Sequence, residues 1–198
     1  MIAIIDYGAG NLRSVANTLE EIGAPYRVLT SPQGLESFQK IILPGVGHFG
    51  QMMRELDSRG LRAAVLERAA ANIPLLGICI GLQCMFEGSE EAPEQKGLGL
   101  FPGKVTRFPL DARVPHMGWN SLDRVKHCLL LDGLDEHPYV YFAHSYYAPL
   151  CDATAASCTY ELPYTATLQR ENIYAVQFHP EKSGPVGLRV MRNFAELC

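Results

Sequence analysis

A cysteine between two glycines is the residue of this sequence best placed to do chemistry. Cys79 is the centre of a Gly-x-Cys-x-Gly pattern at residues 77–81 and directly follows an apolar run of strand length. The pattern is the sulfur counterpart of the Gly-x-Ser-x-Gly nucleophile elbow, in which glycines allow the sharp turn that exposes the central side chain. A helix start after Cys79 would favour its thiolate form. We therefore expect a nucleophile; the alternative is a buried cysteine that packs as a small hydrophobe.

His179 and Glu181 are the expected partners of this thiol. His179 ends the apolar segment 173–178 and begins the sequence His-Pro-Glu. A proline disfavours helical backbone in the residue before it, so we expect an extended segment in which residues 179 and 181 share a face. The carboxylate would then orient the imidazole, and the imidazole would act as the base for Cys79. The alternative is a strand-end histidine beside a surface Glu181.

Acyl transfer also requires backbone N–H donors for an oxyanion. One expected donor is Ile80, directly after the nucleophile, and another is the loop Gly45-Val46-Gly47, whose glycines would let an N–H turn inward.

Residues 45–50 also match the Gly-x-Gly-x-x-Gly dinucleotide fingerprint. That fingerprint requires an acidic residue at the end of the next strand, and the next expected strand ends in Cys79. A nucleotide-binding oxidoreductase is therefore the weaker alternative.

The elements that must position these residues alternate between strand and helix in the first half. Apolar runs predict strands at 2–5, 26–29, 40–43 and 74–78. Helical patterns cover 12–22, with Asn11 as N-cap and Gly23 as stop, then 62–71, and a helix-compatible segment at 82–87. This alternation predicts an α/β fold with a doubly wound, mostly parallel sheet flanked by helices and functional residues at the carboxyl ends of its strands.

The second half is richer in β-formers and turn residues. Strands are expected at 99–105, 117–120, 139–142, 164–169 and 173–178, the last two around a turn at 171–172. These segments predict an added antiparallel part in the C-terminal half. A closing helix over 185–197 should bury Val186, Val190, Phe194 and Leu197. No linker or repeat divides the chain, so we expect a single domain over residues 1–198.

Composition and charge narrow the class of protein. The chain has 198 residues and a net charge of −4, which provides no basic surface for nucleic acid. We expect no membrane association, because no apolar segment approaches spanning length, and the N-terminus has no signal pattern, which predicts a cytoplasmic protein. The six cysteines include no Cys-x-x-Cys pair, which predicts neither a disulfide framework nor a zinc site. No cofactor or metal is expected.

Taken together, the segments at 77–83 and 177–181 resemble those of the class I glutamine amidotransferases, and the similarity extends over essentially the whole chain. A narrower resemblance is to the glutaminase subunits of imidazole glycerol phosphate synthases, enzymes of histidine biosynthesis. It rests on the segments Asp6-Tyr7-Gly8-Ala9-Gly10-Asn11, Pro44-Gly45-Val46-Gly47, Pro115-His116-Met117-Gly118-Trp119-Asn120 and Tyr141-Phe142-Ala143-His144-Ser145-Tyr146.

The resemblance implies hydrolysis of the L-glutamine side-chain amide through a thioester on Cys79, with His179 and Glu181 completing a catalytic triad. It implies that Gln83 and Glu91 hold the α-amino and carboxylate ends of glutamine. Further contacts to the substrate or its oxyanion are implied for Ser145, Tyr146 and the backbone of Gly45, Val46, Gly47 and Ile80. Without the resemblance, the alternative interpretation is that Glu91 is a solvated surface charge and Gln83 an exposed helix residue.

The resemblance also implies a partner, a (β/α)8-barrel cyclase subunit that receives the ammonia within a heterodimer and makes imidazole glycerol phosphate and aminoimidazole carboxamide ribotide. Asn11, Trp119 and Lys182 match positions that the family uses at this interface. The alternative for Trp119 is a mostly buried side chain. The family is expected to complete its oxyanion loop only with partner and ligand bound. Other acceptors, in pyridoxal phosphate, guanylate or anthranilate synthesis, and a catalytically silent partner-binding module remain alternatives.

Overall fold

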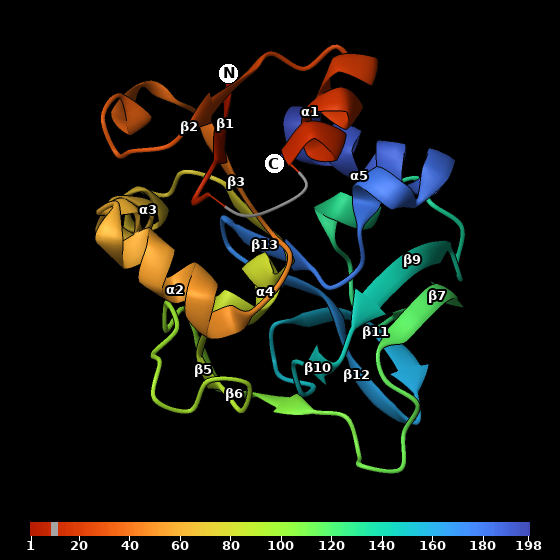
Figure 1. The fold of residues 1–198 in the computed structure, drawn as a ribbon. Helices are drawn as coiled ribbons and strands as arrows, with labels where there is room; N and C mark the ends of the chain where they lie inside the picture. Colours follow the sequence, from red (N-terminus) through yellow and green to blue (C-terminus); the bar gives the residue numbers. More distant parts are fainter. Residues whose placement is uncertain (9–11) are drawn as a thin grey trace.

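An eight-stranded sheet forms the centre of the molecule in the computed structural model, which describes residues 1–8 and 12–198 (Figure 1). The strand order is β2-β1-β3-β4-β13-β12-β11-β8. In that order the strands are Tyr26–Leu29, Ile2–Ile5, Lys40–Gly45, Leu75–Cys79, Ile173–Val176, Leu162–Arg170, Thr154–Tyr160 and Asp123–Arg124. The pairs from β2 to β13 are parallel and those from β13 to β8 antiparallel. The predicted mostly parallel sheet with an antiparallel addition is therefore confirmed.

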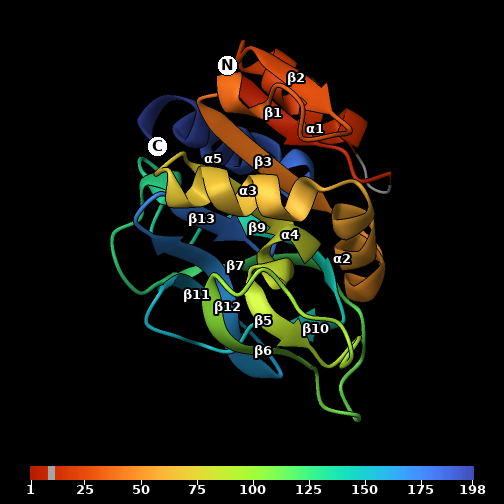
Figure 2. The ribbon, with the colours of Figure 1, turned by 90° about the vertical axis from the view of Figure 1, so that its left-hand side faces the viewer.

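Helices cover both faces of the parallel part, as expected of a doubly wound sheet (Figure 2). Helices α1 (Leu12–Glu21) and α5 (Gly184–Leu197) lie on one face, and α2 (Phe49–Ser58) and α3 (Leu61–Ala70) on the other. The short helix α4 (Ile80–Cys84) follows β4 without a loop. Single 3-10 turns occur at η1 (Leu35–Ser37), η2 (Leu129–Leu131) and η3 (Pro180–Lys182). Among the described residues, no helix is both long and apolar enough to span a membrane.

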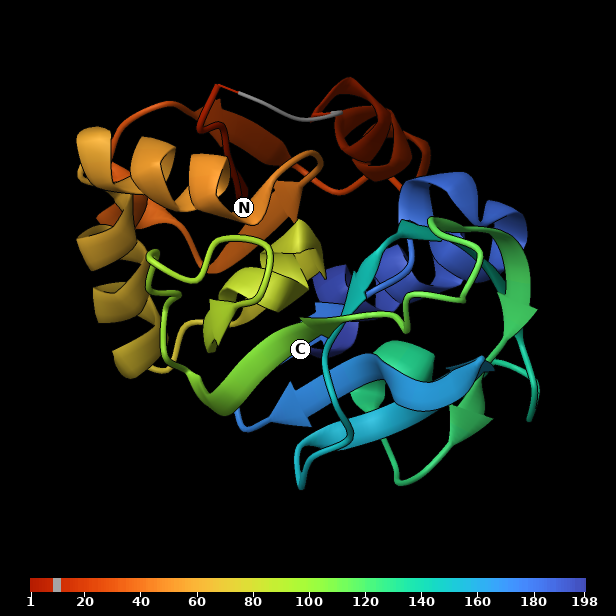
Figure 3. The ribbon, with the colours of Figure 1, turned by 60° about the horizontal axis from the view of Figure 1, so that its bottom comes forward.

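Two smaller β structures lie beside the antiparallel end of the main sheet (Figure 3). One is a three-stranded sheet of β10 (Tyr146–Tyr147), β6 (Phe101–Arg107) and β5 (Phe86–Ser89). The other is a two-stranded antiparallel ribbon of β7 (His116–Ser121) and β9 (Tyr139–His144). The ribbon is tied to the end of β13, because the His179 N–H donates to the Tyr141 carbonyl at 2.9 Å.

Two expectations about helices were wrong. The helix after Cys79 ends at Cys84, and Phe86 begins strand β5 instead, where its ring packs on that of Phe101 with centroids 5.7 Å apart. Leu197 is 46% exposed rather than buried. Lys40, the first residue of β3, donates to the carbonyls of Phe194 and Ala195 in the last turn of this helix. The predicted N-cap Asn11 lies outside the described residues.

Candidate active site

The turn at Cys79 joins the buried strand β4 to helix α4 and is strained at the cysteine itself. Cys79 has φ 54° and ψ −107°, a region that non-glycine residues rarely adopt. The flanking glycines do not carry the positive φ. They provide space instead: a Cβ at Gly81 would lie 2.0 Å from the Leu43 carbonyl oxygen, and one at Gly77 would lie 2.7 Å from the Gly81 carbonyl.

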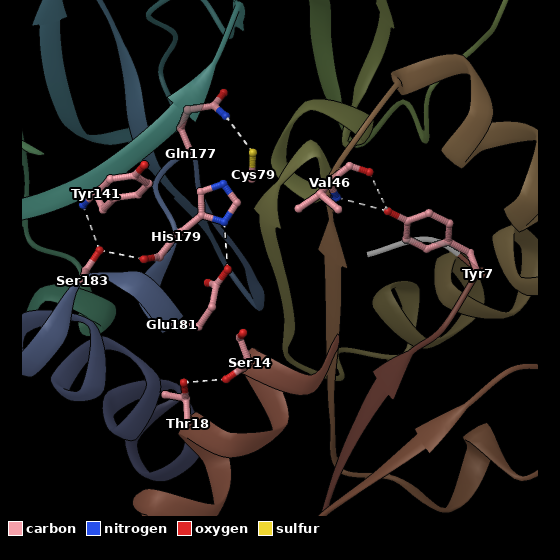
Figure 4. Close-up of polar contacts among 10 residues, drawn as sticks. All are labelled: Tyr7, Ser14, Thr18, Val46, Cys79, Tyr141, Gln177, His179, Glu181 and Ser183. Carbon is pink, nitrogen blue, oxygen red and sulfur yellow. Dashed lines mark hydrogen bonds and ion pairs between the residues drawn. The ribbon is translucent and has the colours of Figure 1, made fainter. Parts of the chain in front are cut away.

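Strand pairing brings His179 to the thiol. Strand β13 runs parallel to β4 with Val176 opposite Ile78, so the segment that follows β13 emerges beside Cys79. His179 Nδ1 and Glu181 Oε1 are 2.8 Å apart, and the imidazole lies between the thiol and the carboxylate (Figure 4). The side chains of His179 and Glu181 are each 3% exposed. The contact was expected, and His179 itself is extended as predicted, but Pro180–Lys182 forms a 3-10 turn rather than continuing the extended segment to Glu181.

The environment of His179 favours its charged form. Burial disfavours a buried cation, but hydrogen bonding and charge from Cys79, and then from Glu181, outweigh it and raise the pKa of His179 to about 10. Both ring nitrogens therefore carry protons at neutral pH. Such an imidazolium can pair with a thiolate and can deliver a proton to a leaving group.

The main chain of His179 is also held in place. The Ser183 hydroxyl donates to the His179 carbonyl at 2.7 Å and accepts from the Tyr141 N–H at 2.9 Å (Figure 4). Sequence reasoning did not find Ser183, and its type and spacing give no signal for this role.

The loop Gly45–Gly47 lies beside the elbow, with Gly45 paired to Cys79 across the sheet. A Cβ at Gly45 would lie 2.9 Å from the Ile80 Cβ, so the glycine permits close packing on the elbow. The Val46 N–H is not turned inward. It donates to the Tyr7 hydroxyl at 3.3 Å, and that hydroxyl is 3.5 Å from the Val46 carbonyl, on the side away from Cys79 (Figure 4). Ile80 is the first residue of α4, a position whose N–H has no partner within the helix.

A cavity of about 270 Å³ opens over Cys79 and contains the predicted substrate residues apart from Gly45. Its lining consists of Val46, Gly47, Cys79, Ile80, Gln83, Glu91, Pro115, Ala143, His144, Ser145, Tyr146, His179 and Lys182. Glu91 is not simply a solvated charge, because its Oε2 accepts from the Phe49 N–H, at the start of α2, at 2.7 Å. Gln83 is 1% exposed rather than on the surface, and its buried Oε1 has no partner among the described residues. The lining thus offers acceptors for an ammonium group near a nucleophile.

Of the predicted interface residues, Lys182 lines this cavity and Trp119 lies beside Tyr141. Trp119 is 56% exposed, so the alternative of a mostly buried side chain was wrong. Its ring meets that of Tyr141 edge-on with centroids 6.1 Å apart, and Lys182 Nζ lies 5.8 Å from the centre of the Tyr141 ring. Asn11 lies outside the described residues.

Comparison with known families and sequences finds relatives over nearly the whole chain. The family described as "Glutamine amidotransferase class-I" matches residues 3–197. A protein of Methanothermobacter thermautotrophicus named "Imidazole glycerol phosphate synthase subunit HisH" is 50% identical over 198 residues, covering 100% of this chain and 98% of its own. A protein of the same name from Desulfitobacterium hafniense is 47% identical and covers 99% of this chain and 94% of its own.

Solved structures share the fold at low sequence identity. One described as "Crystal structure of glutamine amidotransferase" superposes with a TM-score of 0.78 at 20% identity and covers 100% of this chain and 98% of its own. "Structure of PurLQS from Thermotoga maritima" gives a TM-score of 0.76 at 16% identity, with 98% and 96% covered.

Proposed function

This chain belongs to the class I glutamine amidotransferase family, and we propose that it is the glutaminase subunit of an imidazole glycerol phosphate synthase in histidine biosynthesis. Relatives of that name are 47% and 50% identical over nearly the whole chain. Within this proposal residues 1–198 form one domain. The observation that carries it is that Cys79 and His179, with Glu181 hydrogen-bonded behind the imidazole, line the same cavity as Gln83 and Glu91.

The proposed reaction begins with the α-ammonium of glutamine near Glu91 and the free Oε1 of Gln83. The Cys79 thiolate attacks the side-chain carboxamide carbon and forms a C–S bond, and the oxyanion is stabilised by backbone N–H groups at Ile80 and in the loop 45–47. His179 then gives a proton to the departing nitrogen, which leaves as ammonia and yields a glutamyl thioester. Water attacks this thioester, His179 takes the water proton, and glutamate and the Cys79 thiolate are released. Glu181 keeps the imidazole oriented throughout.

The contact between Val46 and Tyr7 bears on when this reaction proceeds. While the Val46 N–H donates to the Tyr7 hydroxyl, it is not available to an oxyanion. Removal of one such donor typically costs about 3 kcal/mol of transition-state stabilisation. We therefore expect the isolated subunit to be slow, and expect turnover to rise when this peptide turns toward Cys79.

The proposal includes a cyclase partner, a (β/α)8-barrel subunit that receives the ammonia in a heterodimer in the cytoplasm. The relatives are named as subunits, which supports assembly with a second chain. Trp119, beside Tyr141, and Lys182, which lines the cavity, supply an exposed surface for that chain.

Glutamate release, measured with the cyclase subunit and its nucleotide present, tests the function. Wild-type protein should release glutamate and support cyclase turnover from glutamine. Cys79→Ala should release none but should still support cyclase turnover from added ammonia. Glutamate release by Cys79→Ala at the wild-type rate would refute the mechanism. Co-purification with a pyridoxal phosphate or chorismate-using synthase, instead of a cyclase, would refute the assignment to histidine biosynthesis.

A further inference from the structure

Gln177 contacts the sulfur of Cys79 from a fully buried position. Its side chain is 0% exposed, and its Nε2 lies 3.7 Å from Cys79 Sγ (Figure 4). Gln177 is two residues before His179 in the sequence. Its amide therefore reaches the thiol from the same chain segment as the imidazole but is a separate group.

The orientation of this amide is determined by the contacts behind it. Gln83 Nε2 lies 2.8 Å from the Tyr146 carbonyl oxygen and 3.1 Å from Gln177 Oε1. A backbone carbonyl only accepts hydrogen bonds, so Gln83 must present its NH₂ group there. The second hydrogen of that group then requires an oxygen on Gln177, which leaves the Gln177 NH₂ facing the sulfur. An NH₂ group is donor only, and a thiolate is a better acceptor than a thiol.

A histidine, His144, donates to the same carbonyl and continues the buried polar network. His144 Nδ1 lies 2.8 Å from the same Tyr146 carbonyl and must therefore carry the hydrogen. His144 Nε2 lies 3.3 Å from the Tyr164 hydroxyl, which lies 3.1 Å from His116 Nδ1. Burial lowers the pKa of His144 to about 3 and that of His116 to about 4, so both rings are neutral at pH 7. Each ring then has one N–H, so Tyr164 donates to His144 and accepts from His116. The hydrogen bonds therefore all point from His116 toward the Tyr146 carbonyl.

We propose that Gln177 is a further catalytic residue, whose amide donates to the Cys79 thiolate and stabilises it both as nucleophile and as leaving group. In the first half-reaction the donor raises the fraction of sulfur that is ionised. In the second it stabilises the thiolate that departs when water attacks the thioester. The second statement depends on the proposed glutaminase function, whereas the first concerns the resting protein alone.

The groups around Cys79 determine what a pH experiment reports. Tyr7 from the end of β1, Cys84 on α4 and Tyr164 on β12 lie near the thiol, and burial raises the pKa of each, so all three are neutral below pH 9. Among the described residues, His179 is then the charged group in contact with the sulfur, with Glu181 behind it. A variant at Gln177 leaves both of these side chains unchanged.

The test is the pH dependence of Cys79 alkylation by iodoacetamide, followed by mass spectrometry of the peptide that contains Cys79. In Gln177→Met, which keeps the volume but removes the donor, the midpoint should rise by about one pH unit, a tenfold loss of thiolate at a given pH. With the cyclase and its nucleotide present, kcat for glutamine should fall about tenfold while KM stays near the wild-type value. Gln169→Met is the matched control: its amide oxygen accepts from the Leu129 N–H, away from Cys79, so its midpoint should not move.

An unchanged midpoint in a folded Gln177→Met protein would overturn the proposal, and this result would not depend on what the enzyme acts on. If the alkylation midpoint shifts in Gln177→Met but the wild-type protein has no glutaminase activity, the hydrogen bond is supported and the proposed function is refuted. A measurement on unaltered protein covers the case in which the variant does not fold. The side-chain amide resonance of Gln177 should titrate with the alkylation midpoint in the wild type and should stay flat in Cys79→Ala; a flat wild-type resonance would also overturn the proposal.

Discussion

At the scale of single residues, the proton of His179 depends on two neighbours that are themselves nearly excluded from water. Burial alone would favour the neutral ring, and the Cys79 sulfur is the first of the contributions that reverse this preference. The positive charge on the His179 imidazole is thus stabilised by its contact with Cys79 and is not intrinsic to the buried histidine. A histidine in this state can donate a proton at a pH where a free one would be mostly neutral.

Cys79→Ala should therefore lower the pKa of His179 from about 10, because it removes the largest stabilising contribution and leaves the cost of burial. Titration of the imidazole nitrogens by NMR would measure the change. His116 serves as an internal control, because its pKa of about 4 comes from burial and should not move. A His179 pKa that is unaltered in Cys79→Ala would mean that the sulfur does not stabilise the charge.

Two buried histidines should make stability dependent on pH. The folded pKa values of His116 and His144, about 4 and 3, lie below the ordinary value near 6.5. The unfolded chain therefore binds these protons first as pH falls, and the free energy of unfolding should decrease between about pH 6.5 and pH 4.

In His116→Phe the free energy of unfolding should fall less as the pH decreases. The substitution removes one titrating ring, and its phenyl ring can still stack between Phe142 and Tyr160. The urea midpoint at pH 7 and at pH 5 gives the comparison. An equal fall in the variant and the wild type would show that His116 is not responsible.

At the scale of elements, the elbow depends on how closely α4 approaches β3. Gly81 lies against the Leu43 carbonyl, and Gly45 lies against Ile80, so α4 and β3 pack against each other through two glycine contacts. Strained backbone such as that of Cys79 persists only where the surrounding packing holds it, and these contacts supply such packing.

Gly81→Ala should disrupt this packing. Its Cβ would lie 2.0 Å from a backbone oxygen that cannot move without shifting the strand, so we expect a loss on the order of 3 kcal/mol in the free energy of unfolding. Gly88→Ala is the control, because its Cβ would meet nothing closer than 3.7 Å. Urea denaturation of both variants provides the measurement; similar stabilities would contradict the packing argument.

The same elements indicate what sequence can and cannot predict. The strands at 2–5 and 26–29 and the positions of Cys79 and His179 followed from apolar runs and local motifs, which the fold preserves. Helix α2 was not assigned, because its start is a glycine-rich segment in which the N-cap is His48, an uncommon type for that position. The direction of the Val46 N–H depends on Tyr7, 39 residues away, and that of the Gln177 amide on Gln83, 94 residues away. No local pattern records such contacts.

At the scale of the whole molecule, the exposed aromatic surface around Trp119 needs an explanation. Trp119 and Met117 are 56% and 63% exposed on the β7 strand. An exposed tryptophan beside polar residues is typical of the centre of a protein interface.

Trp119→Ala should weaken binding of the cyclase subunit by at least about 2 kcal/mol, roughly thirtyfold in Kd, without changing the melting temperature. Leu197→Ala is the matched control. Leu197 is also exposed but lies at the amino ends of the strands, near Lys40, opposite the edge that contains Cys79. Calorimetric titration measures both, and equal affinities would place the interface elsewhere.

The β7–β9 ribbon connects the exposed surface at Trp119 to the wall of the cavity. It bears Trp119 outside, whereas its β9 strand accepts the His179 N–H through Tyr141 and contributes His144 to the cavity wall. A docked subunit that displaces the ribbon would therefore change the affinity of the cavity for its amino-acid ligand. Thermodynamic reciprocity then requires that a ligand in the cavity change the affinity for that subunit by the same factor.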